Sequence, residues 1–152
     1  MLKRRVRSRV GESPMSDPHN LKLVERVIGA WETRDSQAFF ELFHHDVVYD
    51  DVPLGKVMKG HDQFREFYET SIIAFPDIAM KLVAATADAR AGGAEWTLSG
   101  TFTGETELLG KPTGKRFEIR GASFLRFEDG KISYLADYWD MVALSTQLGI
   151  GG

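Results

Sequence analysis

The sequence predicts a single α+β domain in which three N-terminal helices and a curved antiparallel (mixed) sheet enclose one apolar pocket. Apolar residues recur at helical spacing in the first half of the chain, whereas alternation with period two dominates the second half. Clusters of glycine and proline separate these segments. A strongly curved sheet leaves a concavity, and small molecules bind in such hollows. We therefore expect the function to reside in the pocket of a cone-shaped domain.

The first half of the chain is predicted to contain three helices. Ser16 or Asp17 is suited to cap a helix over residues 18–34. Ser36 is expected to cap a second, shorter helix, and a third runs over residues 60–75, ending before a proline. The second helix is predicted to carry the apolar residues Phe39, Phe40, Leu42 and Phe43.

A first strand is predicted between the second and third helices. The periodicity changes to two from Asp46 onward, so Tyr49 and Asp51 share one face of this strand. Pro53 ends the strand, and a short segment near Val57 is expected to pair back on it.

Long strands make up the second half of the chain. Gly92-Gly93 is predicted to form the turn between the first two of them, and Asp129-Gly130 the hairpin turn between the last two. A short helix over residues 142–148 closes the chain. The predicted strands span residues 78–85, 95–103, 117–127 and 132–139.

Composition narrows the class of protein. The 152 residues are 43% hydrophobic, which suits one domain, and the net charge of −3 favours neither nucleic acid nor an anionic membrane as a partner. The chain has no cysteine, which excludes a disulfide framework and a thiolate nucleophile and fits the cytoplasm. No apolar run reaches the roughly 20 residues that span a bilayer.

The first fifteen residues differ in kind from the predicted domain at 16–152. They carry five basic residues and one acid, and no apolar stretch follows, so they do not form a secretory signal. The interpretations are a disordered basic leader or an arm that contacts an acidic partner.

Four segments resemble the SnoaL-like polyketide cyclase family. These are GASFLRFEDGKISYLADYWDMVALSTQLG at 121–149, WTLSGTFTGE at 96–105, KPTGKRFEIRG at 111–121 and LFHHDVVYDDVPLGKVMKGHDQFREFY at 42–68. This family belongs to the nuclear-transport-factor-2-like superfamily, together with ketosteroid isomerases and limonene epoxide hydrolases. The resemblance covers roughly residues 20–149. It implies the cone-shaped NTF2-like (cystatin-like) fold, no cofactor, and a homodimer formed through the outward face of the sheet.

Asp137 is the first candidate catalytic residue. On period two it shares a face with Leu135 and Trp139, and an inward carboxyl there would have a raised pKa suited to proton transfer near neutral pH. Its position also resembles that of the acid/base aspartate of the cyclases. The alternative is an ordinary acid paired with an arginine, and Asp140 is expected to cap the final helix.

Tyr49 and Asp51 are the second and third candidates. They occupy the place of a tyrosine and an asparagine that hold a water in epoxide hydrolases, with a carboxylate in place of the amide. Two inward carboxyls, Asp51 and Asp137, would push each other's pKa apart, so that one acts as acid and the other as base. The alternative is that Asp51 faces solvent.

Several residues depart from the patterns of related enzymes. The Arg and Asp of epoxide hydrolases fall on Trp96 and Leu98, which argues against epoxide hydrolysis. The oxyanion donors of ketosteroid isomerases fall near Val27 and on Ser123. The histidine of anthracycline cyclases also falls near Ser123, which can donate one hydrogen bond but cannot titrate.

The remaining candidates are aromatic residues and histidines. His44 and His45 are expected at a helix end, pointing apart, so no metal site is predicted. Ser123 joins the predicted substrate contacts because its hydroxyl can reach a substrate oxygen. The aromatic residues that either line the pocket or belong to the core are Trp31, Phe39, Phe67, Trp96 and Trp139.

Two functions remain open at this stage. One is a cofactor-free enzyme that performs acid–base chemistry on a small hydrophobic carbonyl compound, as a cyclase, an isomerase or a hydratase. The other is a binding or accessory protein that holds a small apolar ligand without turnover, because the superfamily fold hosts both.

Overall fold

A computed structural model describes residues 16–151, and the basic leader predicted at 1–15 lies outside the described residues. The elements confirm the predicted α+β class. They follow along the chain as α1 (Pro18–Ala30), α2 (Ser36–Phe40), β1 (Phe43–Asp51), β2 (Lys56–Lys59), α3 (Gly60–Ala74), β3 (Ala79–Ala87), β4 (Ala91–Thr101), β5 (Arg116–Glu128), β6 (Lys131–Trp139) and α4 (Met141–Leu148).

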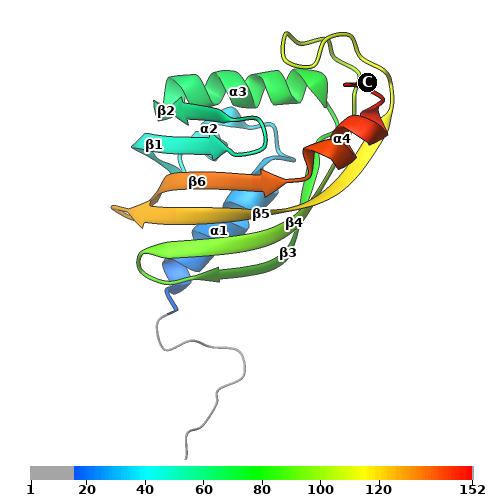
Figure 1. The fold of residues 1–152 in the computed structure, drawn as a ribbon. Helices are drawn as coiled ribbons and strands as arrows, with labels where there is room; N and C mark the ends of the chain where they lie inside the picture. The colour runs from blue at the N-terminus through cyan, green and yellow to red at the C-terminus, as the bar shows by residue number, and fades with distance from the viewer. Residues whose placement is uncertain (1–15, 152) are drawn as a thin grey trace, which may run out of the picture.

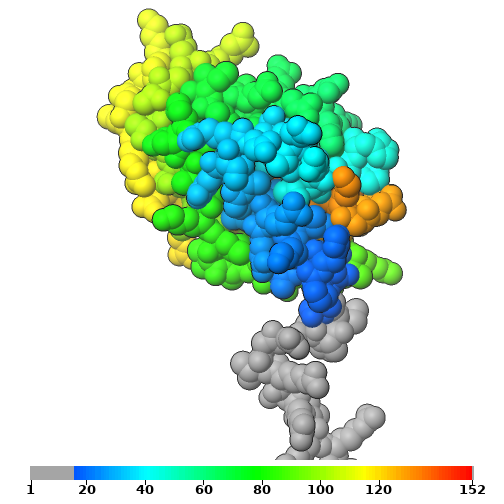
Figure 2. Space-filling view, turned by 180° about the vertical axis from the view of Figure 1, so that it is seen from behind, coloured from blue at the N-terminus to red at the C-terminus, as the bar shows by residue number. Residues whose placement is uncertain are grey.

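One six-stranded sheet in the order β2-β1-β6-β5-β4-β3 forms the wall of the domain. Its neighbouring strands are antiparallel except for β1 and β6, which run parallel, so the sheet is mixed. Figure 1 shows the sheet curving along its long strands, with α1 behind it and α3 beside β1 and β2. Seen from behind in Figure 2, α1 and α3 cover the concave side, and the core lies between these layers.

Some boundaries of the helical half differ from the prediction. α1 ends at Ala30, because Arg34 has a φ of 56° that no α-helix can continue through. Asp35, rather than Ser36, caps α2 by accepting a hydrogen bond from a backbone N–H. Phe43 was predicted in this helix, but it pairs with Ile132 and begins β1. Strand pairing here overrides the helical spacing of the aromatic residues.

The turn between β3 and β4 also differs from the prediction. Gly92 and Gly93 lie inside β4, and the chain reverses at Asp88, whose carboxylate accepts hydrogen bonds from the next backbone N–H groups. A Cβ on Gly92 would lie 3.0 Å from the Phe127 ring, so this glycine serves close packing. The hairpin turn predicted at Asp129-Gly130 is confirmed.

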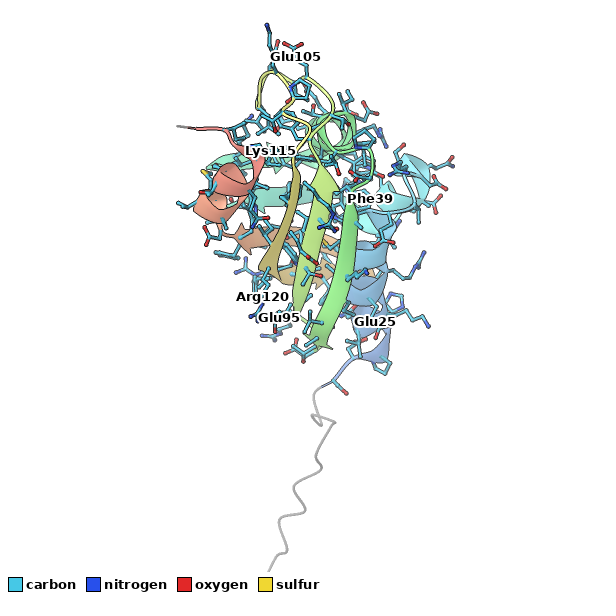
Figure 3. All side chains as sticks on the ribbon, turned by 90° about the vertical axis from the view of Figure 1, so that its right-hand side faces the viewer. Glu25, Phe39, Glu95, Glu105, Lys115 and Arg120 are labelled. Carbon is cyan, nitrogen blue, oxygen red and sulfur yellow. The ribbon has the colours of Figure 1, made fainter. Side chains whose placement is uncertain are left out.

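The outward face of the sheet carries exposed apolar side chains. Glu95 and Arg120 form an ion pair on β4 and β5 of this face, side by side in Figure 3. Within residues 16–151, no helix combines the length and the apolar character needed to cross a bilayer. The exposed apolar residues from the outward-facing strand positions include Val57, Phe124 and Tyr138.

The homodimer stays a prediction, and this face offers a test of it. We expect the purified protein to behave as a dimer in size-exclusion chromatography with light scattering. Phe124→Glu should give a monomer, because a charge would be buried against the partner. Ile73→Glu, at an exposed apolar position on α3, is the matched control and should stay dimeric. A wild-type protein that is monomeric at every concentration would contradict the prediction.

A second prediction concerns the contact between Trp96 and Gly121, which pair across β4 and β5. A Cβ on Gly121 would lie 2.2 Å from the indole ring, so Gly121→Ala should lower the free energy of unfolding by about 1–3 kcal/mol. Gly93→Ala is the control, since its Cβ would meet only an ordinary contact at 3.6 Å. Equal unfolding midpoints in urea for the two variants would show that the contact is unimportant.

Candidate active site

An apolar cavity of about 100 Å³ lies between the concave face of the sheet and the helices. Four aromatic residues predicted to line it do so: Trp31, Phe67, Trp96 and Trp139. Phe39 does not, because it is fully buried in the core and stacks on Tyr68. Sequence reasoning missed other lining residues from loops, from β5 and from α4, since no local pattern marks them as cavity-lining. These include Leu54, Phe75, Leu108, Leu109, Phe117, Ile119 and Leu144.

A wider hollow of about 570 Å³ adjoins this cavity, between β2, α3 and the loop that joins β4 to β5. Phe67, Thr70, Thr106 and Leu108 line both spaces, so the hollow is next to the cavity. Glu105 also lines the hollow and lies on the β4–β5 loop, as Figure 3 shows. A ligand larger than the inner cavity would extend into the hollow.

Two carboxyl groups and a phenol meet at the wall of the cavity. Asp51 and Asp137 pair across the parallel strands β1 and β6, and they are 3% and 5% exposed. The Tyr49 hydroxyl donates a hydrogen bond to Asp137 Oδ2 at 2.7 Å and lies 3.4 Å from Asp51 Oδ2. The structure therefore brings together the three residues predicted to be catalytic, and all three line the cavity.

Further donors hold each carboxyl in place. The Ser123 hydroxyl donates to Asp137 Oδ1 at 2.6 Å, and Trp96 Nε1–H donates to the Ser123 oxygen at 2.8 Å. Trp139 Nε1–H donates to Asp51 Oδ1 at 3.2 Å. Ser123 was predicted to contact substrate, but it is absent from the cavity wall and its hydroxyl hydrogen is directed at Asp137. The sequence alone does not reveal that Ser123 hydrogen-bonds to Asp137, because Asp137 lies on the neighbouring strand β6.

Burial dominates the electrostatics of the site. It raises the pKa of Asp137 to about 6, and hydrogen bonds from Ser123 and Tyr49 partly offset this shift. Burial, and then the charge of Asp137, raise the pKa of Asp51 to about 7. Burial also raises the pKa of Tyr49, so its phenol keeps its proton and remains a donor. No Lys, Arg or His among residues 16–151 lines the cavity. With pKa values of about 6 and about 7, the carboxyl pair holds about one proton at about pH 6.5.

The histidines occupy a different part of the fold. His44 and His45 lie on β1 rather than at a helix end, and their rings stack at 4.2 Å instead of pointing apart. His44 belongs to both clusters of described side chains whose ligand atoms lie close enough to hold a metal ion: one with His45 and Asp46, the other with Glu128 and Asp129. However, His44 Nδ1 accepts a hydrogen bond from the Asp46 backbone, which leaves the proton on Nε2, facing Asp129 at 3.3 Å. In that tautomer the one lone pair of the His44 ring, on Nδ1, is already engaged by the Asp46 backbone N–H and is not free for a metal ion.

The sequence of this chain matches a known protein family. Residues 24–135 match the family model described as a SnoaL-like domain, which is more than half of the chain. No curated protein sequence matches the chain.

Solved structures confirm the fold. A Jannaschia sp. CCS1 protein, provisionally described as a SnoaL-like polyketide cyclase, is 16% identical with a TM-score of 0.79, covering 94% of this chain and 99% of its own. A Catenulispora acidiphila DSM 44928 protein with a ketosteroid isomerase-like fold, in complex with trimethylamine, is 20% identical with a TM-score of 0.74, covering 86% and 94%. AclR from Streptomyces galilaeus, provisionally described as a hydroxylase, is 25% identical with a TM-score of 0.71, covering 84% and 79%.

The raised pKa values predict how stability depends on pH. Both native values lie above the ordinary 3.8, so the native state binds more protons than the unfolded state between about pH 4 and 7. The free energy of unfolding should therefore fall as pH rises through this window. Asp51→Asn should weaken the dependence of the free energy of unfolding on pH. At pH 8 the free energy of unfolding of this variant should be higher than that of wild type by on the order of 2–4 kcal/mol.

Urea denaturation at pH 5 and pH 8 measures this effect. Asp62→Asn, at an exposed position in the first turn of α3, is the control, and it should keep the wild-type slope. If Asp51→Asn also kept that slope, Asp51 would not be the buried group that takes up a proton.

Proposed function

This chain belongs to the SnoaL-like domain family, and from this premise we propose that it catalyses cofactor-free acid–base chemistry on a small hydrophobic carbonyl compound. The reaction class is an aldol-type cyclisation or an isomerisation. The observation that carries the proposal is the contact of Asp137, Tyr49 and Asp51 within hydrogen-bond distance in an apolar cavity. Groups with pKa values near neutrality are suited to exchange protons with a substrate.

The first step is removal of a proton alpha to the substrate carbonyl. The ionised carboxylate of the pair accepts the proton, and the electrons of the C–H bond move into an enolate. The protonated carboxyl donates a hydrogen bond to the developing oxyanion, whose charge the dry cavity leaves otherwise unsolvated. The pair therefore supplies a base and an acid from two residues of the same type.

The second step decides between the two reaction classes. In a cyclisation the enolate carbon bonds to a second carbonyl carbon of the same molecule, and the resulting alkoxide takes the proton of the protonated carboxyl. In an isomerisation the carboxyl that accepted the alpha proton returns it to the enolate at a different carbon, which restores the starting state of the pair. After a cyclisation, one proton passes between the two carboxyls through Tyr49, which lies between them, and restores the starting state.

A second candidate function is ligand binding without turnover. One observation favours it: the donors of Tyr49, Ser123, Trp96 and Trp139 all point at the carboxyl pair or at each other. Because these donors are engaged, a substrate oxygen can accept a hydrogen bond only from a protonated Asp51 or from a Tyr49 hydroxyl that has rotated away from Asp137. A protein that only binds a neutral apolar ligand would not need such a donor.

Deuterium exchange separates the two functions without knowledge of the natural substrate. Small β-keto esters and cyclic ketones are incubated with the protein in D₂O, and incorporation at the alpha carbon is followed by proton NMR. We expect wild type to accelerate exchange for a subset of these compounds. Asp137→Asn should lower the rate by about 10²–10⁴-fold, because the amide cannot accept the proton.

Asp46→Asn serves as the control in this experiment, since it makes the same Asp-to-Asn change at an exposed position on β1. It should exchange at the wild-type rate. Exchange by Asp137→Asn at the wild-type rate would refute the role of Asp137. Saturable binding of these ketones with no exchange by wild type would favour the binding function.

A further inference from the structure

A chain of buried hydrogen bonds leads from Trp96 to the carboxyl pair. The indole N–H donates to Ser123 Oγ at 2.8 Å, and Ser123 Oγ donates to Asp137 Oδ1 at 2.6 Å. Trp96 is 1% exposed, Ser123 6% and Asp137 5%, so water does not replace these contacts. An indole N–H can only donate, which fixes the direction of the first bond.

Gly121 allows Trp96 to occupy this place. The two residues pair across β4 and β5, and a Cβ on Gly121 would lie within 2.2–2.7 Å of the indole ring. Ser123 lies two residues further along β5, on the same face of the sheet. The glycine therefore provides the space that the indole needs to approach the serine.

The direction of the first bond sets the direction of the second. Because Ser123 Oγ accepts the indole hydrogen, its own hydrogen points at Asp137 Oδ1, the acceptor within reach among the described residues. A proton on that carboxylate oxygen would occupy one of its lone pairs and remove the negative charge that the serine hydrogen faces, which weakens this hydrogen bond. Tyr49 donates to the other oxygen of Asp137, so both oxygens accept hydrogen bonds, which favours the ionised form.

Asp51 has a different arrangement. Its Oδ1 accepts from Trp139 Nε1–H and from the Leu54 backbone N–H. Its Oδ2 faces the Tyr49 oxygen at 3.4 Å, while the tyrosine hydrogen is directed at the nearer Asp137. A hydroxyl hydrogen on Asp51 Oδ2 can therefore be donated to the Tyr49 oxygen. In this arrangement Asp51 donates to Tyr49, and Tyr49 in turn donates to Asp137.

We propose that Trp96 is a positioning residue that, acting through Ser123, keeps Asp137 as the ionised base and leaves the shared proton on Asp51. The inference rests on the proposed function, because it assigns the two roles within the same acid–base pair. Trp96 itself touches neither carboxyl group in this scheme. It acts by orienting the hydroxyl that does.

Carboxyl ¹³C NMR titration of aspartate-labelled protein tests the proposal without any substrate. Trp96→Phe keeps the aromatic ring and removes the N–H. We expect the titration midpoint of Asp137 to rise by about one pH unit, the equivalent of weakening one hydrogen bond to a charged group. Trp139→Phe is the matched control, because it removes an indole donor from Asp51 and should raise the midpoint of Asp51 instead.

Ser123→Ala separates the proposed chain from a general packing effect. It should raise the Asp137 midpoint as Trp96→Phe does, and the double variant should match Ser123→Ala alone, because the indole acts only through the serine. An unchanged Asp137 midpoint in Ser123→Ala would overturn the proposal, as would additive shifts in the double variant. This titration can fail while deuterium exchange succeeds, and the reverse, so the proposed function and the role of Trp96 are tested separately.

Discussion

The burial of two carboxyl groups without a cationic partner is the constraint on which the rest of the site depends. Asp51 and Asp137 are almost fully buried, and in the part of the chain that the structure describes no Lys, Arg or His lines their cavity. Ionisation of both would place two negative charges in an apolar space, which is costly. The Tyr49 hydroxyl lies 2.7 Å from Asp137 and 3.4 Å from Asp51, and one proton on the pair removes the repulsion between two buried charges. The same burial that raises the pKa values of the two carboxyl groups thus also suits them to exchange protons with a substrate.

The sheet topology produces this contact. β1 and β6 are the parallel pair of the sheet, and their register places Asp51 beside Asp137. The antiparallel register of β5 and β6 places Ser123 on the opposite side of Asp137. Trp96 on β4 and Trp139 on β6 supply indoles, and these and the apolar side chains of the cavity exclude water, which lowers the local dielectric constant and strengthens each hydrogen bond. A scaffold of strands holds these groups more rigidly than a loop would.

Much of this arrangement could be predicted from residue patterns, and the rest depends on contacts across the sheet. Period-two alternation places Tyr49 with Asp51, and Asp137 with Trp139, on the face that lines the cavity. Helical spacing misled at Phe43, where pairing with β6 decides the conformation. The partner of Ser123 could not be inferred, because no local pattern reveals which strands are neighbours. The direction of the hydrogen bonds likewise emerges only once Trp96 and Ser123 are placed together.

The central claim is that a carboxylic acid in this cavity stays largely protonated at pH 6.5, where a solvent-exposed carboxyl is ionised, because it is buried beside a second carboxyl. Infrared spectroscopy measures this directly, since a protonated carboxyl has a C=O stretching band distinct from that of a carboxylate. At pH 6.5 the wild-type protein should show such a band, and Asp51→Asn should lack most of it. Solvent-exposed aspartates and glutamates are ionised at this pH and do not contribute. A wild-type spectrum without the band at pH 6.5 would contradict the account.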